Sequence, residues 1–175
     1  VLFRSDLSHE VRGSFDQGIA LLKNPAGGLI VQNVTEYAKS LDIDVNEVMG
    51  YLALQELAHA RLFASVPWLM PRFEALLGKY ARGITIDMDA MEEQIREAES
   101  IDPDSMASAV NITKVAFPDT PEQKQAMKAL ENLLALVEGW VDAVVWRAGM
   151  AHIPHIEQLR EMLRRERAIG GPAER

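Results

Sequence analysis

The segment LLALVEGWVDAVVW, residues 133–146, is apolar or glycine at every position except Glu138 and Asp142. Apolar residues recur around it at three- and four-residue spacing, which predicts a helix over about 122–147. Because almost no face of this helix is polar, we expect it to lie at the centre of the fold. Its two carboxylates are four residues apart and share one face. An ionised carboxylate in apolar surroundings needs a partner or a metal ion, whereas the simpler alternative is contact with solvent or with a base such as Arg147.

A second apolar segment, LALQELAHA at residues 52–60, lies within a predicted helix over 45–65. It contains three polar residues, Gln55, Glu56 and His59, and the first and last share a face because they are four positions apart. A single histidine in a helix is ordinarily a core residue with satisfied ring nitrogens. Two apolar helices that each carry isolated polar groups instead predict that these groups meet one another or share an ion.

The pattern as a whole predicts a mainly α fold with a small β element, built on two central helices at about 45–65 and 122–147. Helix starts are indicated by Asp44, with Glu47 at capping-box spacing, and by Thr120 followed by proline. The other predicted elements are a short strand at 29–32, a turn or second short strand at 83–87, helices at 71–80, 89–99 and 155–169, and a loop or mobile segment over 100–121.

Composition excludes several classes of site and partner. The 175 residues include no cysteine, four histidines, 18 Lys plus Arg and 26 Asp plus Glu, for a formal net charge of −8. Disulfides, zinc–thiolate sites and cysteine nucleophiles are therefore excluded. An acidic chain also argues against nucleic-acid binding. The one basic cluster, Arg160 to Arg167, contains Glu161 and Glu166 and is interpreted as a solvated helix end.

No apolar run approaches the length of about 18 residues that a membrane span requires, and no signal-peptide pattern is present. We therefore expect a cytoplasmic protein that does not bind membranes. We expect residues 1–175 to form a single domain. The first residue, Val1, and the turn-like end at 170–175 also indicate that the domain is part of a longer chain.

The polar residues of the two helices match known motifs. Residues 55–59, Gln-Glu-Leu-Ala-His, differ at one position from His-Glu-x-x-His, the zinc-binding helix of metallopeptidases. Residues 138–142 have the Glu-x-x-x-Asp form that supplies a third ligand in the gluzincin branch. From about residue 11 onward the chain resembles an actinobacterial zincin-like family, labelled as hydrolases or as associated with deazaflavin-coenzyme biosynthesis. The matching stretches are GLIV (28–31), LALQELAHARLF (52–63), VPWL (66–69), YARGI (80–84), LLALVEGWVD (133–142) and GGPAE (170–174).

The resemblance implies a zincin-like helical core and a role for each polar residue. Glu56 matches the general base that activates a zinc-bound water, and His59 and Glu138 match metal ligands. Asp142 matches the outer carboxylate that orients a histidine ligand. Gln55 stands where the family motif has its first histidine. Since a neutral amide is a poor substitute for imidazole, the resemblance implies zinc that is bound weakly or not at all.

The other histidines offer little help with this missing ligand. His9 precedes Glu10, but Gly13 occupies the position where a second motif histidine would stand. His152 and His155 flank a proline near a helix start and are interpreted as surface residues, with recruitment as a substitute ligand as the alternative.

Two hypotheses follow from these residues. The first, which we favour, is a zincin-like scaffold with weak or absent peptidase activity that binds a peptide or protein, as a monomer or weak oligomer. The second is an active metal-dependent hydrolase, in which Glu56 activates a metal-bound water. Both predict that His59 and Glu138 come within ligand or hydrogen-bond distance. A separation above about 8 Å would leave a third explanation, a helical domain that matches the motif by coincidence.

Overall fold

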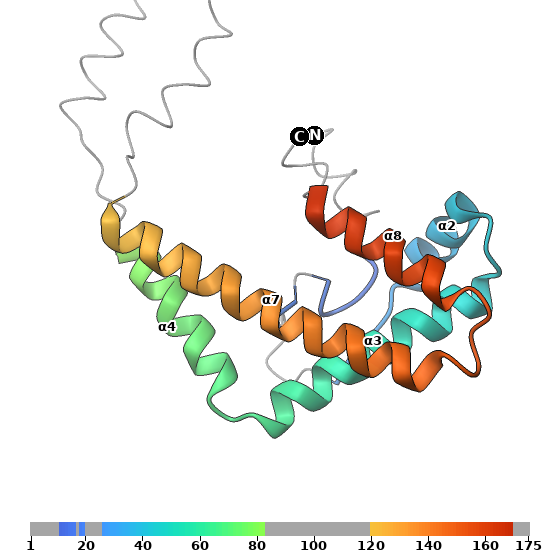
Figure 1. Cartoon of the computed structure of the whole chain (residues 1–175), viewed down its shortest axis with the longest axis horizontal. Coiled ribbons are helices and arrows are strands. Elements are labelled where there is room, and N and C mark those ends of the chain that lie inside the picture. The colour runs from blue at the N-terminus through green and yellow to red at the C-terminus, as the bar shows by residue number, and fades with distance from the viewer. Residues whose placement is uncertain (1–10, 17, 20–25, 83–119, 170–175) are drawn as a thin grey trace, which may run out of the picture. The chain divides into compact units, whose positions relative to one another are not determined.

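The computed structural model describes residues 11–16, 18–19, 26–82 and 120–169. Within them the chain forms a series of helices (Figure 1). In order, these are α2 (Val31–Leu41), α3 (Val45–Ser65), α4 (Leu69–Arg82), α7 (Pro121–Gly149) and α8 (Ile156–Ile169). The mainly α prediction is confirmed. The chain divides into two compact units: unit 1 comprises residues 1–70 and 133–175, and unit 2 comprises residues 71–132.

The β element is smaller than predicted. In the described part of the chain it consists of an isolated antiparallel bridge between Gly13 and Leu29. Ile30 is still extended and its amide donates to the Arg12 carbonyl at 2.9 Å, but α2 begins at the next residue. The strand predicted at 29–32 is therefore wrong beyond its first two residues, because α2 takes over the backbone hydrogen bonds. The predicted elements at 83–87 and 89–99, and the loop up to residue 119, lie outside the described residues.

The start of α3 follows its sequence signal. Asp44 accepts a hydrogen bond from the amide of Asn46 at 2.8 Å, so the predicted helix start and the range 45–65 are both confirmed. Glu47 does not complete the capping box. Its carboxylate instead accepts a bond from the His155 amide at 3.0 Å, which ties the first turn of α3 to the start of α8.

The start of α7 is a reciprocal cap. Thr120 Oγ1 accepts from the amide of Gln123 at 3.2 Å, and the Gln123 side chain accepts from the amide of Thr120 at 2.9 Å. In unit 2, Gln123 also donates to the Tyr80 carbonyl of α4 at 3.1 Å. The predicted helices at 122–147 and 71–80 are confirmed, with α4 beginning two residues earlier because proline is tolerated in a first helical turn.

In unit 1, α2 packs on α3 and α3 packs on α8. Val137, Val141 and Val145 bury one side of α7. On the other side Leu136 is 66% exposed and Trp140 is 42% exposed. Val144, four positions further on, is also exposed, so these residues form an apolar stripe along one face. The expectation that this helix has almost no exposed face is therefore wrong, because much of a folded protein's surface is apolar.

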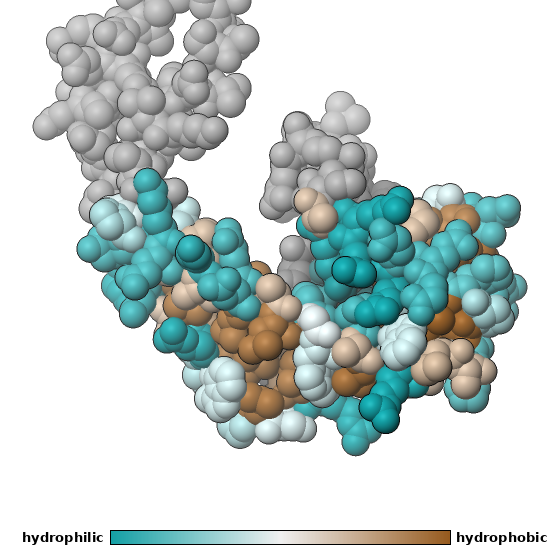
Figure 2. All heavy atoms as spheres, viewed as in Figure 1, coloured by the Kyte–Doolittle hydropathy of each residue, from teal (hydrophilic) through white to brown (hydrophobic). Residues whose placement is uncertain are grey.

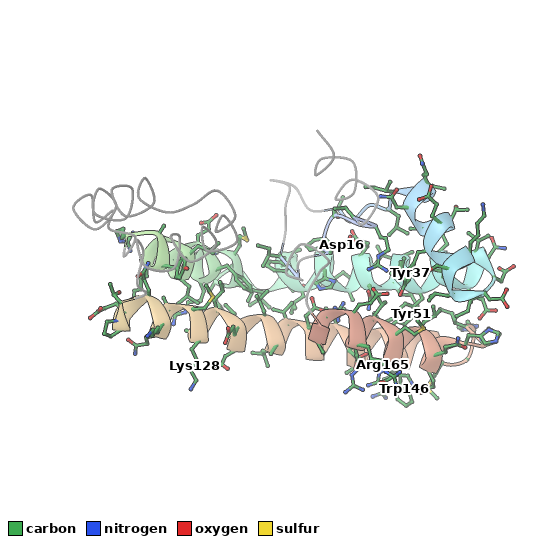
Figure 3. All side chains as sticks on the ribbon, turned by 90° about the horizontal axis from the view of Figure 1, so that it is seen from above. Asp16, Tyr37, Tyr51, Lys128, Trp146 and Arg165 are labelled. Atoms are coloured by element: carbon green, nitrogen blue, oxygen red, sulfur yellow. The ribbon has the colours of Figure 1, made fainter. Side chains whose placement is uncertain are left out.

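The helices of unit 1 enclose Tyr51, whose side chain lies between α3 and the pair formed by α7 and α8 (Figure 3). The outward surface of α8 is hydrophilic (Figure 2), with Glu161, Arg164 and Arg165 exposed along it. No helix in the described ranges is both long enough and apolar enough to cross a membrane.

Candidate functional site

His59 and Glu138 meet in unit 1, as predicted. The imidazole Nε2 lies 2.9 Å from Glu138 Oε1, which joins α3 to α7 across 79 positions of sequence. The other ring nitrogen, Nδ1, donates to the backbone carbonyl of Gln55 at 2.9 Å. This second bond fixes the orientation of the ring and leaves Nε2 directed at the carboxylate. His59 is only 2% exposed, so the pair is closed to bulk solvent on the α3 side.

Phe15 covers the face of this imidazole. Its ring stacks on His59 with a centroid separation of 5.2 Å and an interplanar angle of 13°, and it also contacts the ring of Phe63 at 5.8 Å. Phe15 belongs to the N-terminal segment, which we define as residues 11–16 and 18–19. This segment therefore forms one wall of the site.

Glu56 is bound by the same segment. Its carboxylate accepts from the Ser14 amide at 3.1 Å, the Ser14 hydroxyl at 2.5 Å, the Phe15 amide at 3.1 Å and the Gly28 amide at 2.9 Å. Three of these bonds end on Oε2, which leaves that oxygen no free acceptor site, and the bond from Phe15 ends on Oε1. A Cβ atom added at Gly13 would lie 2.2 Å from Glu56 Oε1, so only glycine allows the backbone to approach this closely.

The second oxygen of Glu138 faces a cation. Arg167 Nη1 of α8 lies 2.5 Å from Glu138 Oε2, an ion pair by distance. The same oxygen is buried and has no directed hydrogen bond, so it depends on the charge of the guanidinium. Gly18, with φ of +72°, passes so close to Glu138 that an added Cβ would lie 2.6 Å from Oε1. Glu138 is thus enclosed by an imidazole, a guanidinium and backbone.

Asp142 forms its own ion pair one turn further along α7. Arg160 of α8 donates to both of its oxygens, from Nε at 2.8 Å and from Nη2 at 2.7 Å. This bidentate bond is the main reason that the pKa of Arg160 is raised. The described contacts of Asp142 therefore join α7 to α8, and they do not include a histidine.

Gln55 is buried beside these groups. Its side-chain amide donates to the Tyr51 hydroxyl at 3.4 Å. Burial, followed by the negative charge of Asp142, raises the pKa of Tyr51 to about 12. The three polar positions of residues 55–59 thus have separate partners: Gln55 contacts Tyr51, Glu56 binds the N-terminal segment and His59 meets Glu138.

Sequence reasoning missed the arginines of this site. The alternative that Glu138 and Asp142 meet a base is confirmed, but the bases are Arg167 and Arg160 instead of Arg147. The interpretation of the cluster from Arg160 to Arg167 as a solvated helix end is wrong for these two residues. The signal was available, because Arg160 and Arg167 are seven positions apart and share a helix face, as Glu138 and Asp142 do at a spacing of four. Ser14 and Phe15 gave no comparable signal, since their contacts come from a segment without helical periodicity.

The described residues do not fit a catalytic zinc ion. Such a site takes three protein ligands and an open position for water. His59 and Glu138 supply two, and no group of three or more His, Asp or Glu side chains that could hold a metal occurs in the described ranges. His155, which pairs with Glu47 at 3.0 Å, and His152 are exposed as predicted. His9 lies outside the described residues.

Comparison with known proteins gives one finding. A family model described as zincin-like metallopeptidase matches residues 3–175 of the chain. Searches of curated proteins and of solved structures find no significant match.

Proposed function

Because the chain belongs to the zincin-like metallopeptidase family, we propose that it retains a zincin-like helical framework in which peptidase activity is weak or lost. It would then act as a scaffold or binding protein. Its ligand would be a peptide or protein, the chemical class that peptidase frameworks accommodate. In this proposal the polar residues of α3 and α7 hold helices together instead of cleaving a substrate.

The observation that carries this proposal is the set of four hydrogen bonds that holds the Glu56 carboxylate. A general base needs a free lone pair directed at the water whose proton it removes. The Glu56 oxygens already accept from Ser14, Phe15 and Gly28 at 2.5–3.1 Å. Oε2 could act as a base only if the N-terminal segment left it, which would deprive several backbone amides of their acceptor, and Oε1 lies against the Gly13 backbone.

The incomplete ligand set supports the same proposal. Gln55 stands at the position of the first motif histidine, and an amide binds zinc far less well than imidazole. Glu138, the downstream ligand, already pairs with His59 and Arg167. Any zinc bound by this chain would therefore be held weakly.

An active metal-dependent hydrolase remains a second candidate because of one specific observation. His59 donates through Nδ1 to a carbonyl, and its Nε2 meets Glu138 at 2.9 Å. A histidine that binds zinc through Nε2 commonly has this arrangement of its other nitrogen. This candidate requires a third ligand and a Glu56 carboxylate released from Ser14.

Hydrolysis of a mixed fluorogenic peptide library, with and without added zinc, tests the proposal. We expect the unmodified protein and Glu56→Gln to give the same signal, equal to the background without protein. A zinc-dependent activity that Glu56→Gln abolishes would contradict the scaffold proposal and support the hydrolase.

A further inference from the structure

We propose that Arg167 takes over the electrostatic role of a metal ion at Glu138, so that restoring a histidine at position 55 is not sufficient to create a zinc site. This inference rests on the proposed function and identifies the group that keeps zinc out. It assigns to α8 a role that the zinc-binding motif in α3 does not reveal.

The first argument is the contact itself. Arg167 Nη1 lies 2.5 Å from a Glu138 oxygen that has no directed hydrogen bond in the structure. A guanidinium carries a positive charge and has no lone pair to offer a metal. Arg167 can therefore neutralise Glu138, but it cannot become a ligand.

The second argument is the register of α8 on α7. Arg160 pairs with Asp142, and Arg167 pairs with Glu138, so two arginines two turns apart meet both carboxylates of the apolar α7 segment. Both carboxylates are thus neutralised without a metal. A chance contact could explain one of these two ion pairs, but it would not explain both.

The third argument is that the end of α8 is anchored. Glu166, next to Arg167, accepts a hydrogen bond at 2.8 Å from Arg12 of the N-terminal segment. The guanidinium of Arg12 also lies over the Tyr37 ring of α2, 4.0 Å from its centroid. The turn that carries Arg167 is therefore held to the N-terminal segment, within unit 1, by contacts independent of Glu138.

These contacts have a direct consequence for metal binding. A divalent ion between His59 and Glu138 would come close to a fixed positive charge, and it would compete with that charge for the same carboxylate. Removing the charge should raise metal affinity, and the gain should be greatest when a histidine at position 55 supplies the third ligand.

Zinc affinity measured by competition with a chromophoric chelator tests this in the intact chain. The variants are Gln55→His, Arg167→Gln and the double variant, with the unmodified protein alongside. We expect Gln55→His/Arg167→Gln to bind zinc at least tenfold more tightly than Gln55→His alone. Arg164→Gln is the matched control. The Arg164 side chain is 61% exposed, compared with 34% for Arg167, and Arg164 pairs with Glu161 at 3.9 Å instead of with Glu138.

An equal affinity of Gln55→His/Arg167→Gln and Gln55→His/Arg164→Gln would overturn the inference. Arg167→Met also removes the charge and keeps an apolar side chain. The zinc affinity of Gln55→His/Arg167→Met therefore tests the inference even if the glutamine variant folds poorly. Arg167→Lys retains the charge, so Gln55→His/Arg167→Lys should bind no more tightly than Gln55→His, and tenfold tighter binding would also overturn the inference. Tight stoichiometric zinc in the unmodified protein would instead contradict the proposed function, so the two failures are distinguishable.

Discussion

Ser14 donates two hydrogen bonds to Glu56, one from its backbone amide at 3.1 Å and one from its hydroxyl at 2.5 Å. The two residues are 42 positions apart, so this contact fastens the N-terminal segment to the middle of α3. Phe15, the next residue, stacks on His59 from the same segment. The carboxylate that the motif presents as a catalytic base is therefore part of the attachment between two parts of unit 1.

Glu56→Gln should lower the free energy of unfolding by about 2–4 kcal/mol. The amide retains one acceptor oxygen, but its NH₂ group would face the amides of Ser14, Phe15 or Gly28. Chemical denaturation measures the loss, and hydrogen exchange should show faster exchange at these amides.

Glu161→Gln is the control for this variant, because it makes the same chemical change at an exposed ion pair of α8. We expect it to change stability by less than about 0.5 kcal/mol. If Glu56→Gln proved as stable as this control, the structural role of Glu56 would be contradicted and its role as a free base would gain support.

Gly13→Ala should destabilise unit 1 by about 1–3 kcal/mol, because the new Cβ would overlap a Glu56 carboxylate oxygen. Gly28→Ala provides the matched control in the same region. A Cβ at Gly28 meets nothing within 4 Å, and its amide would still donate to Glu56. Thermal unfolding of the pair measures the difference, and equal melting temperatures would show that the glycine backbone does not approach Glu56 as described.

The pKa of Tyr51 gives a prediction for alkaline pH. Burial raises this pKa from 10.0 to about 12 in the folded chain. Below pH 10 the phenol is neutral in both states and its contribution to stability is complete. Between pH 10 and 12 the unfolded chain ionises first, so the free energy of unfolding falls as pH rises, by about 1 kcal/mol at pH 11.

Tyr51→Phe should remove this part of the alkaline loss. Urea denaturation at pH 8 and pH 11 measures the decrease for the unmodified protein and for the variant, and we expect the smaller decrease in the variant. An equal decrease in both proteins would rule out Tyr51 as the group responsible.

The helices that begin with a strong local signal were predictable. Asp44 and Thr120 cap α3 and α7 through their side chains, and both helices occur where their sequences predict them. α2 was missed because it has no side-chain cap and follows a turn rich in glycine. Its first residues, with β-branched Val31 and Thr35, favour strand as readily as helix.

The site was predictable only where its residues lie on helices with a clear sequence pattern. Helical spacing and the motif brought out His59 and Glu138, and their 2.9 Å contact confirms that they meet. The partners of Glu56 and Asp142 could not be inferred in the same way. The partners of Glu56 come from an irregular segment without periodicity. The helical spacing of Arg160 and Arg167 indicates a shared face, but it does not specify which carboxylate each arginine contacts.

The zinc content of the unmodified protein tests the central claim most directly. The intact chain is equilibrated with excess zinc, dialysed against metal-free buffer and measured by elemental analysis. We predict well below one equivalent, because Gln55 leaves the site one ligand short and Arg167 already neutralises Glu138. One tightly held equivalent that disappears in His59→Ala would contradict the account and establish a metal centre at this pair.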